Sequence, residues 1–133
     1  MPRRPILIID DDPGAAEAFV PMLRTHGYDV TAFGAAEAAL EEIERRLPMA
    51  VLVDLHLPTI DGLEFVRRVR SNREHSDLPI AMMTADYFID DRVTDELQTL
   101  GVSLHFKPLW EPDLVNVVER LTAAPGIYRA AGE

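Results

Sequence analysis

The chain has no cysteine, which excludes disulfide bridges and thiolate metal sites and fits a cytoplasmic protein. Positive charge is also scarce, with 13 Lys and Arg against 23 Asp and Glu. The resulting net charge of −10 argues against direct binding to a nucleic-acid backbone. Long apolar runs are absent too: the basic start at Met1–Pro5 is followed only by Ile6–Ile9, too short for a signal peptide or membrane span. No internal repeat or low-complexity segment interrupts the 133 residues, which predict a single globular domain.

The chain is organised around one short apolar run. Ala50 to Val53 is continuous and contains β-branched residues, as expected for a strand buried on both faces. The run ends on Asp54, after which Pro58 and Gly62 indicate a loop. A carboxylate at the end of a buried strand is costly, so Asp54 is a candidate functional residue.

Other segments follow the same alternation of strand and helix. We predict further strands at Ile6–Ile9, Tyr28–Phe33 (a half-exposed edge strand), Ile80–Thr84 and Val102–Phe106. Predicted helices cover Gly14–His26, Ala35–Leu47, Leu63–Arg70, Asp90–Leu100 and Glu111–Leu121. Pro21 should kink or divide the first helix, and Ser71–Asp77 should be a polar loop. Five strands alternating with five helices predict an α/β fold with a parallel sheet covered on both faces.

Polar residues follow four of the predicted strands. They are Asp10 with Asp11, Asp54, Thr84 and Lys107. The carboxyl ends of parallel strands share one edge of a sheet, where ligands bind, so these side chains should converge. Three carboxylates and one ammonium leave two negative charges, which a divalent cation neutralises. Oxygen ligands without a His or Cys cluster favour Mg²⁺ or Mn²⁺, and the whole set suits phosphoryl transfer to an aspartate.

A simpler interpretation of the acidic run is helix capping. Asp10, Asp11 and Asp12 precede Pro13, which suits the first position of a helix with Asp12 as its cap. Taken alone, the cluster would be better explained in this way. Asp54 and Lys107 at the ends of other strands favour the functional interpretation.

Taken together, these motifs resemble a known family. Asp10-Asp11, Asp54 with Leu57-Pro58 and Asp61-Gly62, Thr84-Ala85 and Lys107-Pro108 occur in the order and spacing of the CheY-like receiver domains of bacterial two-component response regulators. The resemblance covers about Pro5 to Leu121. It implies a five-stranded flavodoxin-like sheet of order 2-1-3-4-5.

The resemblance also implies residue roles. Asp54 would accept a phosphoryl group from a histidine kinase or a histidine phosphotransfer protein. Asp11 would bind Mg²⁺ directly, Asp10 through the ion's waters, with Asp54 and the backbone carbonyl of His56 completing the protein ligands. Phosphoryl oxygens would contact Thr84, the amide of Ala85, and Lys107. The added charge would then switch the surface formed by the fourth helix, fifth strand and last helix.

One position departs from the family pattern. Three residues before the lysine the family usually has Tyr or Phe, whose ring moves inward on activation, and here that residue is Leu104. The substitution argues against aromatic switching at this position and favours a pure relay role. His56 and Asp86, two residues after Asp54 and Thr84, should border the phosphoryl site.

Two alternatives compete with the function of a phosphorylated signalling domain that is not itself an enzyme. An aspartyl-phosphate phosphatase usually has a second acid two residues after its nucleophile, where this chain has His56. A degenerate docking or dimerisation module would have lost the acids or Lys107, and neither is lost.

For domain organisation, we expect a receiver over residues 1–121 and a tail or linker over 122–133. No output module follows the last predicted helix, so the chain is either a complete single-domain regulator or a receiver lacking a C-terminal output domain. Its target would be a separate protein or that missing domain. A second copy of the chain is a further candidate partner.

Overall fold

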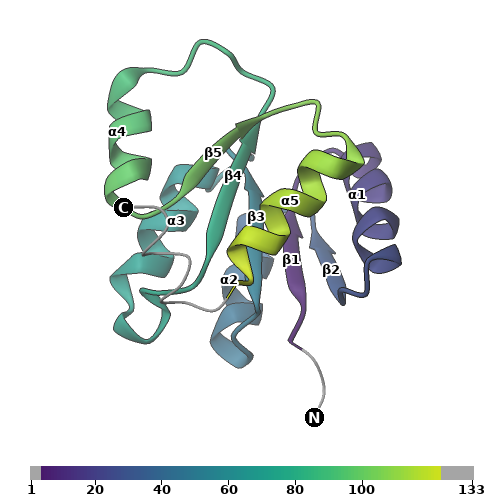
Figure 1. Ribbon diagram of the computed structural model, residues 1–133. Coiled ribbons are helices and arrows are strands. Elements are labelled where there is room, and N and C mark those ends of the chain that lie inside the picture. The colour runs from purple at the N-terminus through teal and green to yellow at the C-terminus, as the bar shows by residue number, and fades with distance from the viewer. Residues whose placement is uncertain (1–3, 124–133) are drawn as a thin grey trace.

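Five parallel strands form one sheet in the computed structural model, which describes residues 4–123 (Figure 1). The strand order is β2-β1-β3-β4-β5. The strands are β1 (Ile6–Ile9), β2 (Val30–Phe33), β3 (Ala50–Asp54), β4 (Ile80–Thr84) and β5 (Ser103–Phe106). The helices are α1 (Pro13–Thr25), α2 (Ala36–Arg45), α3 (Gly62–Ser71), α4 (Asp91–Thr99) and α5 (Glu111–Leu121). The predicted fold class and the strand order implied by the resemblance are both confirmed.

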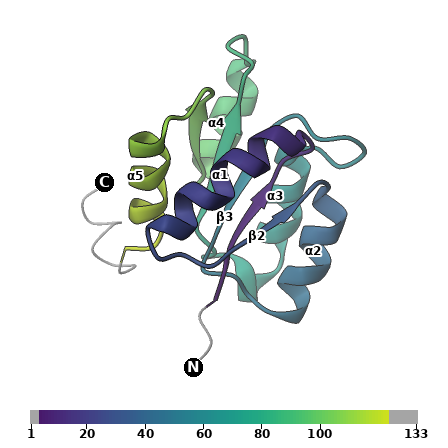
Figure 2. The same ribbon diagram turned by 90° about the vertical axis from the view of Figure 1, so that its right-hand side faces the viewer.

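Helices cover both faces of the sheet. Figures 1 and 2 show α1 and α5 on one face and α2, α3 and α4 on the other. Ile6 and Ile8 of β1 pack in the core beneath α1 and α5, whereas Leu7 and Ile9 pack in the opposite core. Successive side chains of a strand point to opposite faces, so both alternations of a central strand must be apolar. This burial explains why β1, β3 and β4 are continuous apolar runs in the sequence.

Element boundaries differ from the predictions by a few residues, with two informative differences. α1 runs through Pro21 without a break, so the predicted division of this helix is wrong, and the Thr25 hydroxyl donates to the Pro21 carbonyl at 2.9 Å. Packing of the inner face of α1 on the sheet, through Phe19 and Leu23, outweighs the backbone hydrogen bond that Pro21 cannot donate.

The second difference lies after α3, where the predicted polar loop contains a short 3₁₀ helix at Arg73–His75, whose His75 is buried.

The register of the strands brings their carboxyl ends together. Ile9 of β1 lies opposite Val53 of β3, so the next residues of the two strands, Asp10 and Asp54, follow in step. In the pair formed by β4 and β5, Thr84 lies opposite Phe106, which comes one residue before Lys107. The predicted tail lies outside the described residues from 124 onward.

Candidate functional site

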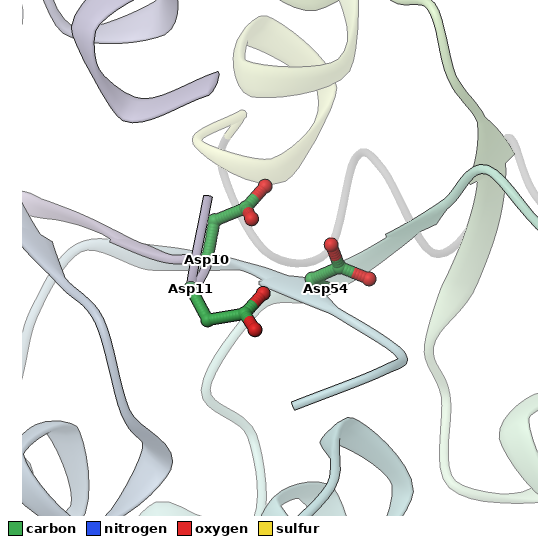
Figure 3. A group of neighbouring side chains, drawn as sticks. All are labelled: Asp10, Asp11 and Asp54. Carbon is green, nitrogen blue, oxygen red and sulfur yellow. The ribbon is translucent and has the colours of Figure 1, made fainter. Parts of the chain in front are cut away.

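Three carboxylates gather where β1 and β3 end. Figure 3 shows Asp10, Asp11 and Asp54 close together, and each offers an oxygen within 4.8 Å of the other two. Asp10 and Asp54 are buried, whereas Asp11 is exposed. The predicted convergence of these acids is therefore present in the fold.

Lys107, which follows the edge strand β5, contacts two of these acids. Its ammonium donates to Asp10 Oδ2 at 2.6 Å and to Asp54 Oδ2 at 2.9 Å, although these acids lie 97 and 53 residues away in the sequence, respectively. Burial alone would lower the pKa of Lys107, but the hydrogen bonds to Asp10 and Asp54 outweigh it and the pKa is raised. The lysine is accordingly a fixed positive charge at neutral pH.

The remaining carboxylate oxygens are held by the backbone of the following loops. Asp10 Oδ1 accepts from the amide of Asp12, and Asp54 Oδ1 accepts from the amide of His56, both at 3.0 Å. Burial nevertheless raises the pKa of Asp10, because desolvation outweighs the hydrogen bonds from Lys107 and Asp12. The carboxylates are thus oriented, but their combined negative charge is not fully compensated.

The donor set fits a hard divalent cation. Three carboxylates supply only oxygen, the ligand that Mg²⁺ prefers, and Asp11 provides one that is open to solvent. A dication would bring the sum of the three carboxylates and Lys107 to zero. The residues present therefore fit the Mg²⁺ or Mn²⁺ expected from the sequence.

Thr84 and Lys107 are linked through their backbones. The amide of Lys107 donates to the Thr84 carbonyl at 2.8 Å. The Thr84 hydroxyl is fully buried and accepts from the amide of Asp86 at 3.0 Å, which leaves its own proton to donate. Ala85, the next residue, is exposed at this edge of the sheet.

Comparison with known proteins decides the family. The profile of the response regulator receiver domain matches residues 6–119. This chain is a receiver domain. The DNA-binding response regulator MtrA of Mycolicibacterium smegmatis is 39% identical over 83 residues, which make up 62% of this chain and 35% of that protein. The chain thus corresponds to little more than a third of the length of that relative.

Solved structures agree with this assignment. A sensor protein from Polaromonas sp. is 34% identical, with a TM-score of 0.79, and the match covers 91% of this chain and 97% of the other. The chemotaxis protein CheY4 of Vibrio cholerae is 22% identical with a TM-score of 0.80 and coverage of 90% and 99%, which shows the shared fold. The protein is therefore the receiver domain of a two-component response regulator, a signalling domain with bacterial relatives.

A glycine allows the loop after β3 to lie close against α3. A Cβ on Gly62 would lie 2.4 Å from the backbone carbonyl oxygen of Asp54, closer than real side chains approach. The amide of Gly62 donates to the Leu55 carbonyl at 2.8 Å, and Asp61 caps α3 by accepting from the amide of Glu64. The Asp61-Gly62 pair of the family motif thus forms the contact between α3 and the end of β3.

His56 and Asp86 meet above this edge of the sheet. His56 Nε2 lies 3.0 Å from Asp86 Oδ2, which joins the loops after β3 and β4. Hydrogen bonding from the amide of Phe88 and then from His56 lowers the pKa of Asp86. The sequence predicted that both residues border the site, but not that they contact each other, since loop conformation has no periodic signal.

The position of the usual switch aromatic lies partly buried. Leu104 packs against the core shared by α2, α3 and α4. Close to it in the sequence, Phe106 stacks on Tyr87 with ring centroids 5.2 Å apart and planes 15° from parallel. Sequence reasoning did not single out Tyr87. An exposed aromatic pair at Tyr87-Phe88, directly after the Thr84 motif, was the available signal.

No helix in the described part of the chain, residues 4–123, is long and apolar enough to cross a membrane.

Proposed function

We propose that Asp54 is the phosphoacceptor of this receiver. The observation that carries the proposal is the pair of hydrogen bonds from Lys107 to Asp10 and Asp54 beside a cluster of three carboxylates. An ammonium at this point lies where phosphoryl oxygens on Asp54 would need a counter-charge. Thr84, with a hydroxyl proton to donate, ends the neighbouring strand.

In the proposed reaction, an Asp54 carboxylate oxygen attacks the phosphorus of a phosphohistidine on a histidine kinase or phosphotransfer protein. The new bond is P–O, and the bond that breaks is P–N, whose electron pair leaves with the imidazole nitrogen. Lys107 and Thr84 bind the oxygens of the transferred group, together with the amide of Ala85. The same site assists slow hydrolysis of the phosphoaspartate.

Asp11 and Asp54 would hold Mg²⁺ directly, with the His56 carbonyl as a further ligand and Asp10 acting through the ion's waters. When bound, the ion supplies the positive charge that offsets the oxygens of donor and acceptor. The fit rests on the oxygen donors of the cluster and on its uncompensated charge.

The added phosphoryl charge would bias the surface formed by α4, β5 and α5, where a target, a second copy or an output domain reads it. A hollow beside β5 and α5, lined by Phe106, Leu109, Asp113 and Asn116 among others, supports this assignment.

Within the chain, we assign residues 1–121 to the receiver and 122–133 to a tail or linker.

Intact mass spectrometry tests the proposal. The protein is incubated with acetyl phosphate, with Mg²⁺ or with a chelator, beside the Asp54→Asn variant. We expect one phosphoryl adduct that needs Mg²⁺ and is lost in the variant. A folded protein without an adduct would favour a docking module, and an adduct without Mg²⁺ or on another residue would contradict the site.

A further inference from the structure

Tyr87 makes two contacts that join the loop after β4 to the loop after β5. Its ring stacks on Phe106, and its hydroxyl donates to the backbone carbonyl of Lys107 at 2.6 Å. The receiver has a leucine, Leu104, where the family usually has the switching aromatic, and that side chain is partly buried against the core. An aromatic link between the two loops therefore exists here, but at another position.

We propose that Tyr87, through its stack on Phe106 and its hydrogen bond to Lys107, transmits the phosphorylation state of Asp54 to the loop between β5 and α5. This inference rests on the proposed function, because it concerns the consequence of a phosphoryl group on Asp54.

The connection begins at Thr84. Its hydroxyl accepts from the amide of Asp86, and the side chain of Asp86 in turn accepts from the amide of Phe88 at 2.9 Å. Tyr87 lies between these two anchored residues. A movement of Thr84 toward phosphoryl oxygens therefore pulls on Asp86 and displaces Tyr87 with it.

The connection closes at Lys107. The Lys107 carbonyl accepts from Tyr87, its amide donates to the Thr84 carbonyl, and its ammonium donates to Asp54. All three polar groups of one residue are thus tied to the acceptor, to the strand end beside it or to Tyr87. Displacement of Tyr87 either breaks its hydrogen bond to the Lys107 carbonyl or pulls that carbonyl with it. In both cases the restraint on the start of the β5–α5 loop changes.

The surroundings favour movement across the loops rather than along α4. Tyr87 is 62% exposed and Phe106 43%, so the stacked rings can separate without disturbing the core. By contrast, α4 is fastened to α3, because Arg67 binds both carboxylate oxygens of Glu96 with its Nε and Nη2. In Figures 1 and 2, the loop that follows β4 extends beyond the sheet before α4 begins.

The test separates adduct formation from transmission. Adduct formation is measured by intact mass with acetyl phosphate and Mg²⁺. Transmission is measured by NMR shifts of the Lys107 and Leu109 amides and of the indole of Trp110, the only tryptophan of the chain, on full-length ¹⁵N-labelled protein. The variants are Tyr87→Ala, Tyr87→Phe, which keeps the ring but removes the hydroxyl, and Phe88→Ala. Phe88 is the matched control, because its side chain is 95% exposed.

We expect all variants to form the adduct to within twofold of the wild-type extent. Tyr87→Ala should lose more than half of the shift seen in the wild type, Tyr87→Phe an intermediate share, and Phe88→Ala none. Shifts in Tyr87→Ala equal to those of the wild type would overturn the inference while leaving the acceptor in place. So would a wild-type adduct that leaves the β5–α5 resonances unchanged. Absence of any wild-type adduct would overturn the proposed function itself.

Discussion

The acids of the site lie at the ends of enclosed central strands of the receiver, whereas its lysine and the stacked pair Tyr87 and Phe106 lie at an edge strand or in the loops beside it. Every residue of β1 and β3 is buried, but β5 is only partly covered and ends at the exposed Phe106. The proposed phosphoryl transfer needs carboxylates held in fixed positions, which the enclosed strands favour. The proposed signal needs a part that can move at low cost, which the exposed loops favour. Four predictions test this division.

Replacing Gly62, beside the end of the enclosed strand β3, should have the largest effect on stability. In Gly62→Ala the new methyl group would meet the backbone of Asp54, which cannot turn aside as a side chain can. We expect a loss of about 3 kcal/mol of unfolding free energy in urea denaturation, the upper part of the range for overpacking. The control is Gly34→Ala, where nothing lies within 4 Å of the added atom and the change should stay within about 0.5 kcal/mol. Equal effects of the two changes would contradict the close contact.

Magnesium should stabilise the receiver through its exposed acid. At a concentration one hundred times the dissociation constant, a ligand that binds only the folded state adds about 2.7 kcal/mol. We expect thermal unfolding to shift upward with Mg²⁺ in the wild type and hardly at all in Asp11→Asn. Asp12→Asn is the matched control, since Asp12 caps α1 through the amide of Gly14 and asparagine caps equally well. A similar Mg²⁺ response in both variants would exclude Asp11 as a ligand.

Neutralising Asp10 should stabilise the metal-free protein. Because burial raises the pKa of Asp10, its charged form is disfavoured in the folded state. This cost is absent below the ordinary carboxyl pKa of about 4 and grows as the pH rises through the raised value.

Asp10→Asn should therefore be more stable than the wild type at pH 7 in a chelating buffer. The gain in unfolding free energy should be smaller than the loss caused by Gly62→Ala. The advantage should shrink as the pH falls toward 4, as measured by urea denaturation at each pH. An advantage that does not depend on pH would show that the charge of Asp10 is not its source.

Separating α4 from α3 should affect only local motion. Arg67→Gln removes the paired hydrogen bonds to Glu96, but both side chains are at the surface, so unfolding free energy should hardly change. We expect faster amide hydrogen exchange in α4 alone. Arg45→Gln breaks a pair with Glu42 within α2 and should leave the exchange of α4 unaltered. Unchanged exchange in Arg67→Gln would mean that packing of Leu97, not this pair, holds the helix.

Much of the site could be predicted because strand ends of a parallel sheet converge. Asp10, Asp54, Thr84 and Lys107 each directly follow or end a predicted strand, so identifying the strands was enough to place the residues together. Their proposed roles stay predictions. Tyr87 could not be placed in the same way, since its contacts depend on the path of one loop. The His56–Asp86 contact went unpredicted for the same reason.

The succession of strands and helices, the burial of both sheet faces and the edge at which polar residues collect can all be inferred from the amino-acid sequence. Those features follow from periodicity, which is local and repeated many times along the chain. The folded structure is needed to see that Lys107 contacts Asp10 and Asp54, that Leu104 packs against the core and that Tyr87 joins two loops. Such contacts are made between segments far apart in sequence, and each depends on the packing of whole elements rather than on any one stretch of residues.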